Sequence, residues 1–227
     1  MKEAICIIPA RGGSKRIKNK NIKIFHGKPL IYYSIKSAKK TKLFEKIFVS
    51  TDSKRIKNIA KSYGAICNGL RSKKISKDTT PTFSVIKDFV SKIKFNFKYL
   101  VCIYPATPMI DYKDILRGFS LINKNNKIDV IIPVSKFNNH PFRSLIIKNK
   151  KIRPLNNKNF KKNSNFLPEL FFDTGSFYIL KKEFILKNNY FFPSKAVPLV
   201  IKKNKYIDIN DNEDLNLAKN IFTSKTY

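Results

Sequence analysis

The sequence predicts an α/β protein with a mainly parallel sheet, and three observations point to this class. Short apolar runs typical of buried strands alternate with segments whose apolar residues recur at helical spacing. The length of 227 residues suits a single domain. Hydrophobic residues make up 42% of the chain, which is enough to fill a core even at a formal charge of +32. We therefore expect one α/β domain over 1–227, with three layers: helices, a sheet and helices again.

The first part of the chain alternates strands and helices in a regular way. Residues 3–10 (EAICIIPA) are almost wholly apolar, as expected of a strand buried in a parallel sheet. Pro29 opens the next helix, because proline is tolerated in a first turn where its missing N–H has no partner to lose. The same patterns predict further strands at 46–51, 99–104 and 129–134, and helices from Ser53 to a cap at Gly64, at 82–94 and at 111–122.

The pattern degrades between residues 136 and 172, where Asn, Lys and Pro dominate. Two short β-like pieces, 144–148 and 151–155, stand inside this stretch, so we expect an inserted hairpin arm over 136–172. The α/β pattern then returns. It predicts a strand at 176–180, a helix after Lys181, a strand at 205–209 and a last helix at 212–222.

The positive charge does not by itself indicate a nucleic-acid-binding protein. Only seven of the 47 basic residues are Arg, the better bidentate reader of phosphates and base edges. Lys is accompanied by Asn, Ile, Phe and Tyr, whose codons are rich in A and T, so a genome-wide base bias explains its excess. A basic nucleic-acid-binding module stays open as the alternative of another class, but it leaves the ordered α/β alternation unexplained.

The sequence also bears on location and redox state. No apolar run approaches the roughly 20 residues that span a bilayer, and the first apolar stretch is too brief for a signal peptide. We expect a cytoplasmic protein with no membrane partner. The three cysteines, Cys6, Cys67 and Cys102, lie far apart in apolar runs, which predicts reduced thiols in the core.

The loop after the first strand carries the most informative residues. In open parallel sheets, ligands bind outside the carboxyl ends of the strands. Residues 11–16 (RGGSKR) put two glycines beside a hydroxyl and three cations, so that backbone N–H groups and positive side chains can both meet an anion. The loop matches neither the G-x-x-x-x-G-K-[ST] nor the G-x-G-x-x-G pattern. We expect a phosphate cradle here, extended by Lys20 and Asn21.

This loop belongs to a longer stretch, residues 7–35 (IIPARGGSKRIKNKNIKIFHGKPLIYYSI), that resembles the N-terminal signature of the cytidylyltransferases that activate nonulosonic (sialic-type) acids. The resemblance continues to the C-terminus through FVSTDS, Leu70-Arg71 before SKDTT, IYPATP, HPFR, FFDTGSFYI and YIDINDNEDLNLA. It implies a Rossmann-like nucleotidyltransferase fold. It also implies that CTP reacts with a nine-carbon α-keto acid sugar to give the CMP-sugar and pyrophosphate.

The resemblance implies roles for individual residues around the nucleotide. Those expected to bind it are Ala10, Arg11, Gly12, Gly13, Ser14, Lys15, Lys20, Asn21, Arg71 and Thr80. Those expected to be catalytic are Arg11, Lys15, Lys20 and Asp208. Attack of a sugar hydroxyl on the α-phosphorus gathers negative charge, which cations, N–H groups and a metal ion stabilise without a covalent intermediate.

The loop after the last expected strand is where the resemblance places a metal ion, Mg²⁺ or alternatively Mn²⁺. Mg²⁺ takes carboxylate oxygens together with substrate phosphates. The family pattern there is D-x-D, whereas this chain has Asp208 and then Asn210. Either the affinity for metal falls or Asp211 substitutes. Asp211 is equally well explained as the cap of the C-terminal helix.

Further residues are implied to bind the sugar. Asp173 and Gly175 form a D-x-G segment that, with Thr107 in IYPATP, resembles the pseudaminic acid members. N-acetylneuraminate and legionaminate remain alternatives, and IYPATP disfavours 3-deoxy-octulosonate. Arg143 in HPFR suits the sugar carboxylate, because its planar fork matches two oxygens. The family further suggests a homodimer whose arms exchange and complete the neighbouring site.

Overall fold

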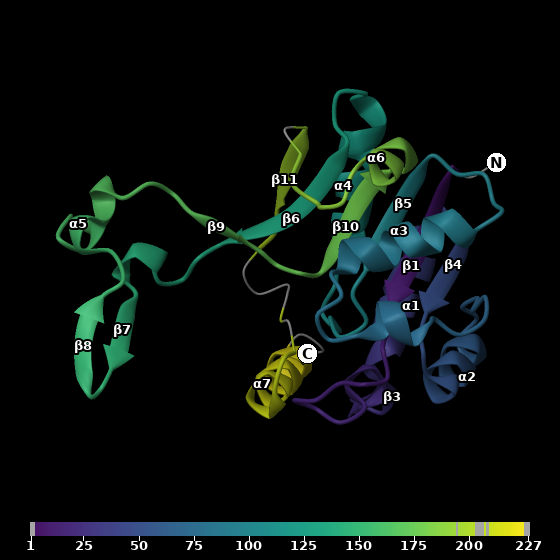
Figure 1. The fold of residues 1–227 in the computed structure, drawn as a ribbon, viewed down its shortest axis with the longest axis horizontal. Helices are drawn as coiled ribbons and strands as arrows, with labels where there is room; N and C mark the ends of the chain where they lie inside the picture. Colours follow the sequence, from purple (N-terminus) through teal and green to yellow (C-terminus); the bar gives the residue numbers. More distant parts are fainter. Residues whose placement is uncertain (1–2, 194, 203–206, 208, 225–227) are drawn as a thin grey trace.

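A mixed sheet organises the protein, here described from a computed structural model that covers residues 3–193, 195–202, 207 and 209–224. The described strands form a seven-stranded sheet in the order β11-β6-β10-β5-β1-β4, with β9 paired to β6 (Figure 1). Its strands are β1 (Ala4–Pro9), β4 (Phe44–Ser50), β5 (Tyr99–Ile103), β6 (Val130–Lys136), β9 (Phe171–Asp173), β10 (Phe177–Lys181) and β11 (Ala196–Val200). β1 is parallel to β4 and β5, β6 is parallel to β11, and β10 runs antiparallel to both its neighbours. The expectation of a mainly parallel sheet is confirmed.

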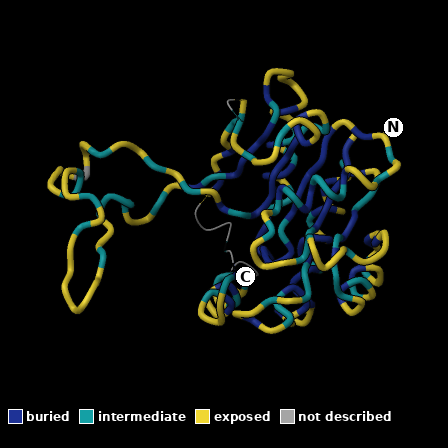
Figure 2. The backbone as a smooth tube through the Cα atoms, viewed as in Figure 1, coloured by how far each residue is buried: buried dark blue, intermediate teal, exposed yellow. Residues whose placement is uncertain are grey.

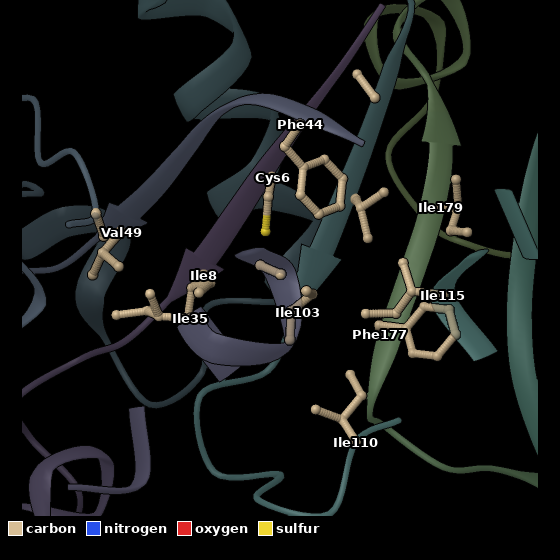
Figure 3. Close-up of a cluster of buried hydrophobic side chains, with 14 of the residues drawn as sticks. Cys6, Ile8, Ile35, Phe44, Val49, Ile103, Ile110, Ile115, Phe177 and Ile179 are labelled. Atoms are coloured by element: carbon tan, nitrogen blue, oxygen red, sulfur yellow. The ribbon is translucent and has the colours of Figure 1, made fainter. Parts of the chain in front are cut away.

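Helices cover both faces of this sheet, which confirms the three-layer α/β/α arrangement. One face packs against α1 (Leu30–Thr41), α2 (Lys54–Ser62) and α4 (Tyr112–Lys124), and the other against α3 (Thr82–Lys92) and α6 (Lys182–Lys187). β1 shows why both faces are covered. Its side chains alternate between the two layers. Cys6 and Ile8 belong to one core cluster, which Figure 3 shows, and Ile5 and Ile7 belong to the other.

A third, smaller cluster holds the start of α1 against the end of the chain. The hairpin of β2 (Ile24–Phe25) and β3 (Lys28–Pro29) leads into α1, and α7 (Asn212–Ser224) packs on it. Phe25 is fully buried there, with its ring centroid 5.2 Å from that of Phe222. Because residues 11–23 lie between β1 and this hairpin, the cluster anchors the far end of the glycine-rich loop.

Residues 137–170 leave the body between β6 and β9 and form an arm that projects to one side (Figure 1). It contains η3 (Pro141–Arg143), β7 (Leu145–Lys148), β8 (Lys151–Pro154), α5 (Asn157–Phe160) and η4 (Ser164–Phe166). Its two strands pair with each other, close to the two pieces predicted from the sequence. Much of the arm is exposed (Figure 2), including Ile147, which is 75% exposed, and Ile152, which is 64% exposed.

The structure differs from the sequence expectation mainly near the C-terminus. The strand expected at 205–209 falls largely outside the described residues. β11 was not predicted, because Pro198 stands in its middle and proline lacks the N–H that a ladder needs. β11 lies at the edge of the sheet, where that missing donor is tolerated. Within the described part of the chain, no helix has the length and apolar character needed to cross a membrane.

Candidate functional site

A pocket of about 260 Å³ opens beyond the carboxyl ends of β1 and β5, where a parallel sheet is expected to bind its ligand. Two short 3-10 helices help to shape it, η1 (Lys20–Ile22) and η2 (Lys73–Ser76). Most of the lining side chains are polar, and many are cations. The lining residues are Pro9, Arg11, Ser14, Lys15, Arg16, Ile17, Lys20, Asn21, Arg71, Ile75, Lys77, Asp78, Thr80, Thr82, Val85, Tyr104, Pro105, Ala106 and Asn210.

Many of the residues proposed from the sequence meet in this pocket, although they come from five separate parts of the chain. Those that line it are Arg11, Ser14, Lys15, Lys20, Asn21, Arg71, Thr80 and Asn210. The other residues do not line it, and these are Ala10, Gly12, Gly13, Thr107, Asp173, Gly175 and Asp211. Arg143 lies on the arm. Asp208 lies outside the described residues.

The backbone N–H groups of Gly12 and Ser14 donate to acceptors within the protein, whereas the expected phosphate cradle would direct them to an anion. The Gly12 amide donates to Oδ1 of Asp52 at 2.8 Å, and the Ser14 amide donates to the Gly12 carbonyl at 3.0 Å. In this conformation the positive charge of the pocket therefore comes from side chains. Gly12 has a packing role as well, because a Cβ there would lie 3.0 Å from Cβ of Ser53.

Two cations of the loop converge on one carboxylate. Asp78 forms ion pairs with Arg11 and, at 2.8 Å, with Lys15. Arg11 and Asp78 are each 35% exposed, whereas Lys15 is 83% exposed. The Arg11 pair is therefore the better shielded of the two from water and salt.

η1 orients the next two residues of the expected cradle. Asn19 precedes it with φ 57°, a left-handed conformation that asparagine tolerates. The Lys20 ammonium donates to the Ile209 carbonyl at 2.7 Å, and the buried Asn21 amide donates to the Arg11 carbonyl at 2.8 Å. Asn21 thereby holds the loop from behind, and Lys20 links it to the C-terminal segment.

Arg71 forms the wall toward β4 and the loop after it. Its guanidinium donates to Oγ of Ser76 at 3.0 Å, and its backbone N–H donates to the Thr51 carbonyl at 2.7 Å. Burial lowers the pKa of Arg71, and the nearby carboxylate of Asp52 works in the opposite direction. A half-buried guanidinium near a carboxylate is a well-oriented donor for a polar ligand.

The opposite wall contains Tyr104 and Thr82, which the sequence reasoning missed. The Tyr104 hydroxyl donates to Oγ1 of Thr82 at 2.7 Å. Thr107, expected to bind substrate, is buried and donates instead to the Tyr104 carbonyl at 2.8 Å, where it holds the turn. The sequence indicated this wall because the turn follows the carboxyl end of β5, where ligands bind in parallel sheets. That position identified the turn but did not identify Tyr104 as the residue that lines the pocket.

Asp173 and Gly175 lie beside this wall. The Gly175 amide donates to Oδ1 of Asp173 at 2.9 Å, and the Tyr178 hydroxyl donates to Oδ2. Burial raises the pKa of Tyr178, and the rings of Tyr104 and Tyr178 meet edge to face at 5.9 Å. Both carboxylate oxygens of Asp173 therefore accept a hydrogen bond, and its partner Tyr178 contacts Tyr104, which lines the pocket.

The loop expected to bind metal leads directly into α7, and its residues Asn210 and Asp211 hydrogen-bond with the first turn of that helix. Oδ1 of Asn210 accepts a hydrogen bond from Arg16 at 2.6 Å. Oδ1 of Asp211 accepts from the Asp214 amide at 2.9 Å, and Oδ2 of Asp214 accepts from the Asp211 amide at 3.2 Å, a reciprocal cap of the helix. Among the described residues, no group of three or more His, Cys, Asp or Glu side chains could hold a metal ion without further ligands such as substrate phosphates.

Arg143 is engaged within the arm. Its guanidinium donates to the carbonyls of Phe160, at 2.5 Å, and of Lys162, and it lies 5.3 Å from the centroid of the Phe160 ring. In the single chain it therefore ties η3 to α5.

An α/β/α sheet with a cation-lined pocket at the carboxyl ends of its strands is typical of proteins that bind nucleotides or other phosphate-bearing ligands. A family model described as "Cytidylyltransferase" matches residues 5–207, so the chain belongs to the cytidylyltransferase family. The predicted family membership is confirmed.

Individual relatives cover nearly the whole chain. A pseudaminic acid cytidylyltransferase of Campylobacter jejuni is 30% identical over 96% of this chain and 95% of its own length. An N-acylneuraminate cytidylyltransferase of Escherichia coli is 31% identical over 97% of this chain and 52% of its own length. A CMP:2-keto-3-deoxy-manno-octonic acid synthetase has a similar fold, with a TM-score of 0.74, 13% identity, and 98% and 99% of the two chains covered.

Proposed function

We propose that this chain transfers CMP from CTP to the anomeric hydroxyl of a nonulosonic acid, preferably pseudaminic acid, and releases pyrophosphate, as a step in surface glycan biosynthesis. The observation that carries the proposal is the meeting of Arg11, Ser14, Lys15 and Lys20 in one pocket at the carboxyl edge of the sheet. The relative from Campylobacter jejuni, named for pseudaminic acid, supports the sugar. The relative named for N-acylneuraminate keeps N-acetylneuraminate as the second candidate, beside legionaminate.

The reaction needs charge stabilisation more than a protein nucleophile. The anomeric hydroxyl gives up its proton to solvent and its oxygen bonds to the α-phosphorus. The bond from that phosphorus to the bridging oxygen breaks, and pyrophosphate leaves with the bonding electron pair. Arg11, Lys15 and Lys20 would hold the phosphates and offset the charge that develops on their oxygens. Asn21 supports this work from behind, because its amide fixes the carbonyl of Arg11.

We propose Mg²⁺, with Mn²⁺ as a substitute, as the metal that accompanies CTP. A divalent ion would neutralise part of the charge on the phosphates, which are themselves its preferred ligands. Asn210 lines the pocket, and its amide oxygen is a suitable ligand for such an ion, although it also accepts from Arg16. Asp208 belongs to this proposal from the family pattern and lies outside the described residues. Asp211 is occupied as a helix cap, so we leave it out of the ligand set.

We propose that the sugar binds on the side of Tyr104, near Asp173. The Asp173 carboxylate is held by Gly175 and Tyr178 and keeps lone pairs for a hydroxyl or amide donor of the sugar. The acylamino groups of these sugars are donors of that kind.

We also propose that the protein is a homodimer joined through the arm, with Arg143 brought to the partner's sugar carboxylate. Ile147 and Ile152, directly paired on β7 and β8, are largely exposed in the single chain. Replacing both by Asp is expected to give monomers in sedimentation velocity. Leu121→Asp, at an exposed leucine of α4, is expected to leave the dimer intact. Dimers that survive the double change would contradict the arm interface.

The central test measures pyrophosphate release from CTP with a panel of purified nonulosonic acids. We expect turnover with pseudaminic acid, and loss of at least about a hundredfold in kcat/KM for Arg11→Ala and Lys15→Ala. Arg55→Ala, an exposed arginine on α2, serves as the control. Turnover that survives both cradle changes would refute the nucleotide site. Turnover with N-acetylneuraminate but not with pseudaminic acid would refute the sugar preference.

A basic nucleic-acid-binding module makes a different prediction in the same experiment. Diffuse binding to RNA would weaken by a small increment with each lost cation, and no pyrophosphate would form.

A further inference from the structure

Asp78 lies among cations that the proposed function assigns to phosphates. It is the one acidic residue among the described residues that line the pocket, and the cations beside it there are Arg11, Lys15, Arg16, Lys20, Arg71 and Lys77. Its carboxylate pairs with Arg11 and with Lys15. An anion from the protein thus sits where the proposed function places an anion from the substrate.

We propose that Asp78 is a displaceable counter-ion that competes with the phosphates of the nucleotide and of pyrophosphate for Arg11 and Lys15. This inference rests on the proposed function for the identity of the ligand. It goes beyond that function by giving Asp78 a part in ligand exchange.

The location of Asp78 suits a group that moves in and out of contact. It follows η2 and precedes α3, on a segment where the Thr80 amide donates to the Lys77 carbonyl at 3.1 Å. Such a turn can shift while η2 and α3 keep their own packing. Lys77 and Thr80, its neighbours, line the same pocket, so displacement of Asp78 would leave them beside the ligand.

Charge decides which anion occupies the pair of cations. A carboxylate brings a single negative charge, whereas a triphosphate or a pyrophosphate brings several and can make more charge-assisted hydrogen bonds. The polyphosphate therefore wins at working concentration. Its apparent affinity is nevertheless lowered by the fraction of molecules in which Asp78 holds the cations.

The same competition acts on the product. Pyrophosphate that remains after CMP transfer is held by Arg11 and Lys15, and the return of Asp78 offers these cations another partner. The counter-ion thereby lowers the affinity for pyrophosphate and speeds its release, at the cost of weaker CTP binding. No covalent step at Asp78 is involved.

Asp78→Asn tests the inference, because it removes the charge and keeps the shape. We expect the dissociation constants of CTP and of inorganic pyrophosphate, measured by calorimetry at low salt, to fall by about fivefold, as for the loss of two partly exposed ion pairs. In turnover we expect a lower KM for CTP, a lower inhibition constant for pyrophosphate and a lower kcat. The gain in affinity should shrink at about 0.5 M salt, where the pairs are screened.

Two variants make this result decisive. Asp129→Asn removes the same charge from an ion pair with Lys181 at the opposite edge of the sheet, and it should leave both affinities unchanged. Asp78→Ser removes the charge with a different side chain and should repeat the effect if Asp78→Asn folds poorly.

Unchanged or weaker binding of pyrophosphate in both Asp78 variants would overturn the inference, and weaker binding would indicate instead that Asp78 serves the ligand or its metal ion. The pyrophosphate measurement needs no nucleotide and no turnover. If the wild type fails to use CTP while Asp78→Asn binds pyrophosphate more tightly, the proposed function is wrong and the counter-ion role stands. If the wild type converts CTP and the Asp78 variants do not bind pyrophosphate more tightly, the proposed function stands and the counter-ion role is wrong.

Discussion

The backbone amide of Gly12 donates a 2.8 Å hydrogen bond to Oδ1 of Asp52, which ties the glycine-rich loop to the turn after β4. The two segments also come close at Ser53, the residue that caps α2 through its hydroxyl, so that a Cβ at Gly12 would lie 3.0 Å from Cβ of Ser53. Asp52 lies near Arg71 as well, where its charge opposes the effect of burial on the arginine pKa. The carboxylate of Asp52 therefore binds the glycine-rich loop through Gly12 and also lies near Arg71 on the wall of the pocket.

Gly12→Ala is expected to lower kcat/KM for CTP by roughly ten- to a hundredfold, because the new Cβ would lie 3.0 Å from Cβ of Ser53 and would push the loop away. Gly13→Ala is the matched control, since a Cβ there meets nothing within 4 Å. Steady-state kinetics of both variants check this. Equal losses in the two variants would contradict a packing role that is specific to Gly12.

Asp211→Ala is expected to destabilise α7 without changing the metal requirement. The side chain caps the helix by accepting from the Asp214 amide at 2.9 Å, and loss of such a cap costs about 1 kcal/mol. For a chain of this length, that lowers Tm by about 2–4 °C. Asp211→Asn, which keeps an acceptor, should lose less. A shift in the Mg²⁺ concentration that gives half-maximal activity would show instead that Asp211 is a ligand.

Much of the fold was predictable because apolar residues form continuous runs in the buried strands and recur at helical spacing in the helices. β1 is apolar at nearly every position, so it had to lie in a buried sheet, and its place at the start of the chain put the RGGSKR loop at the ligand-binding edge. β11 escaped prediction because its edge position, which makes Pro198 acceptable, is a property of the assembled sheet.

The contacts within the site were less predictable. The pairing of Arg11 with Asp78 and of Gly12 with Asp52 joins residues that are far apart in the sequence. No local pattern indicates which carboxylate will meet which cation, since tertiary packing decides it. The residue types of the pocket followed from the motifs, and the partners of those residues required the structure.

Asp173→Asn is expected to raise KM for the sugar by about tenfold and to leave KM for CTP unchanged, because it removes a charged acceptor only from the side of the pocket that we propose for the sugar. Tyr178→Phe should act in the same direction but more weakly, since it removes one donor to Asp173 and leaves the carboxylate. Tyr190→Phe, at a residue 58% exposed, is the control. Equal changes in the two KM values would show that Asp173 supports the pocket as a whole.

Cys102→Ala is expected to flatten the loss of stability at alkaline pH. Burial raises the pKa of the Cys102 thiol, so the thiol stays protonated in the folded state when it would ionise in the unfolded chain. Its contribution is fully present below roughly pH 8.5 and is lost as pH rises above that value, by up to about 1.4 kcal/mol per pH unit. Urea unfolding from about pH 8 to pH 10.5 measures this slope.

Cys67→Ala provides the comparison. Burial also raises the pKa of Cys67, but the nearby Lys57 and Lys61 act against it, so its thiol should contribute less to the slope. Each substitution also costs stability through the cavity that it leaves, which shifts the whole curve and does not alter its slope. The slope of the free energy of unfolding against pH counts the protons released on unfolding. A Cys102→Ala curve parallel to that of the wild type would contradict the prediction, because it would mean that the thiol ionises equally in the folded and unfolded states. Complete burial of Cys102 on β5, between β1 and β10, argues against equal ionisation.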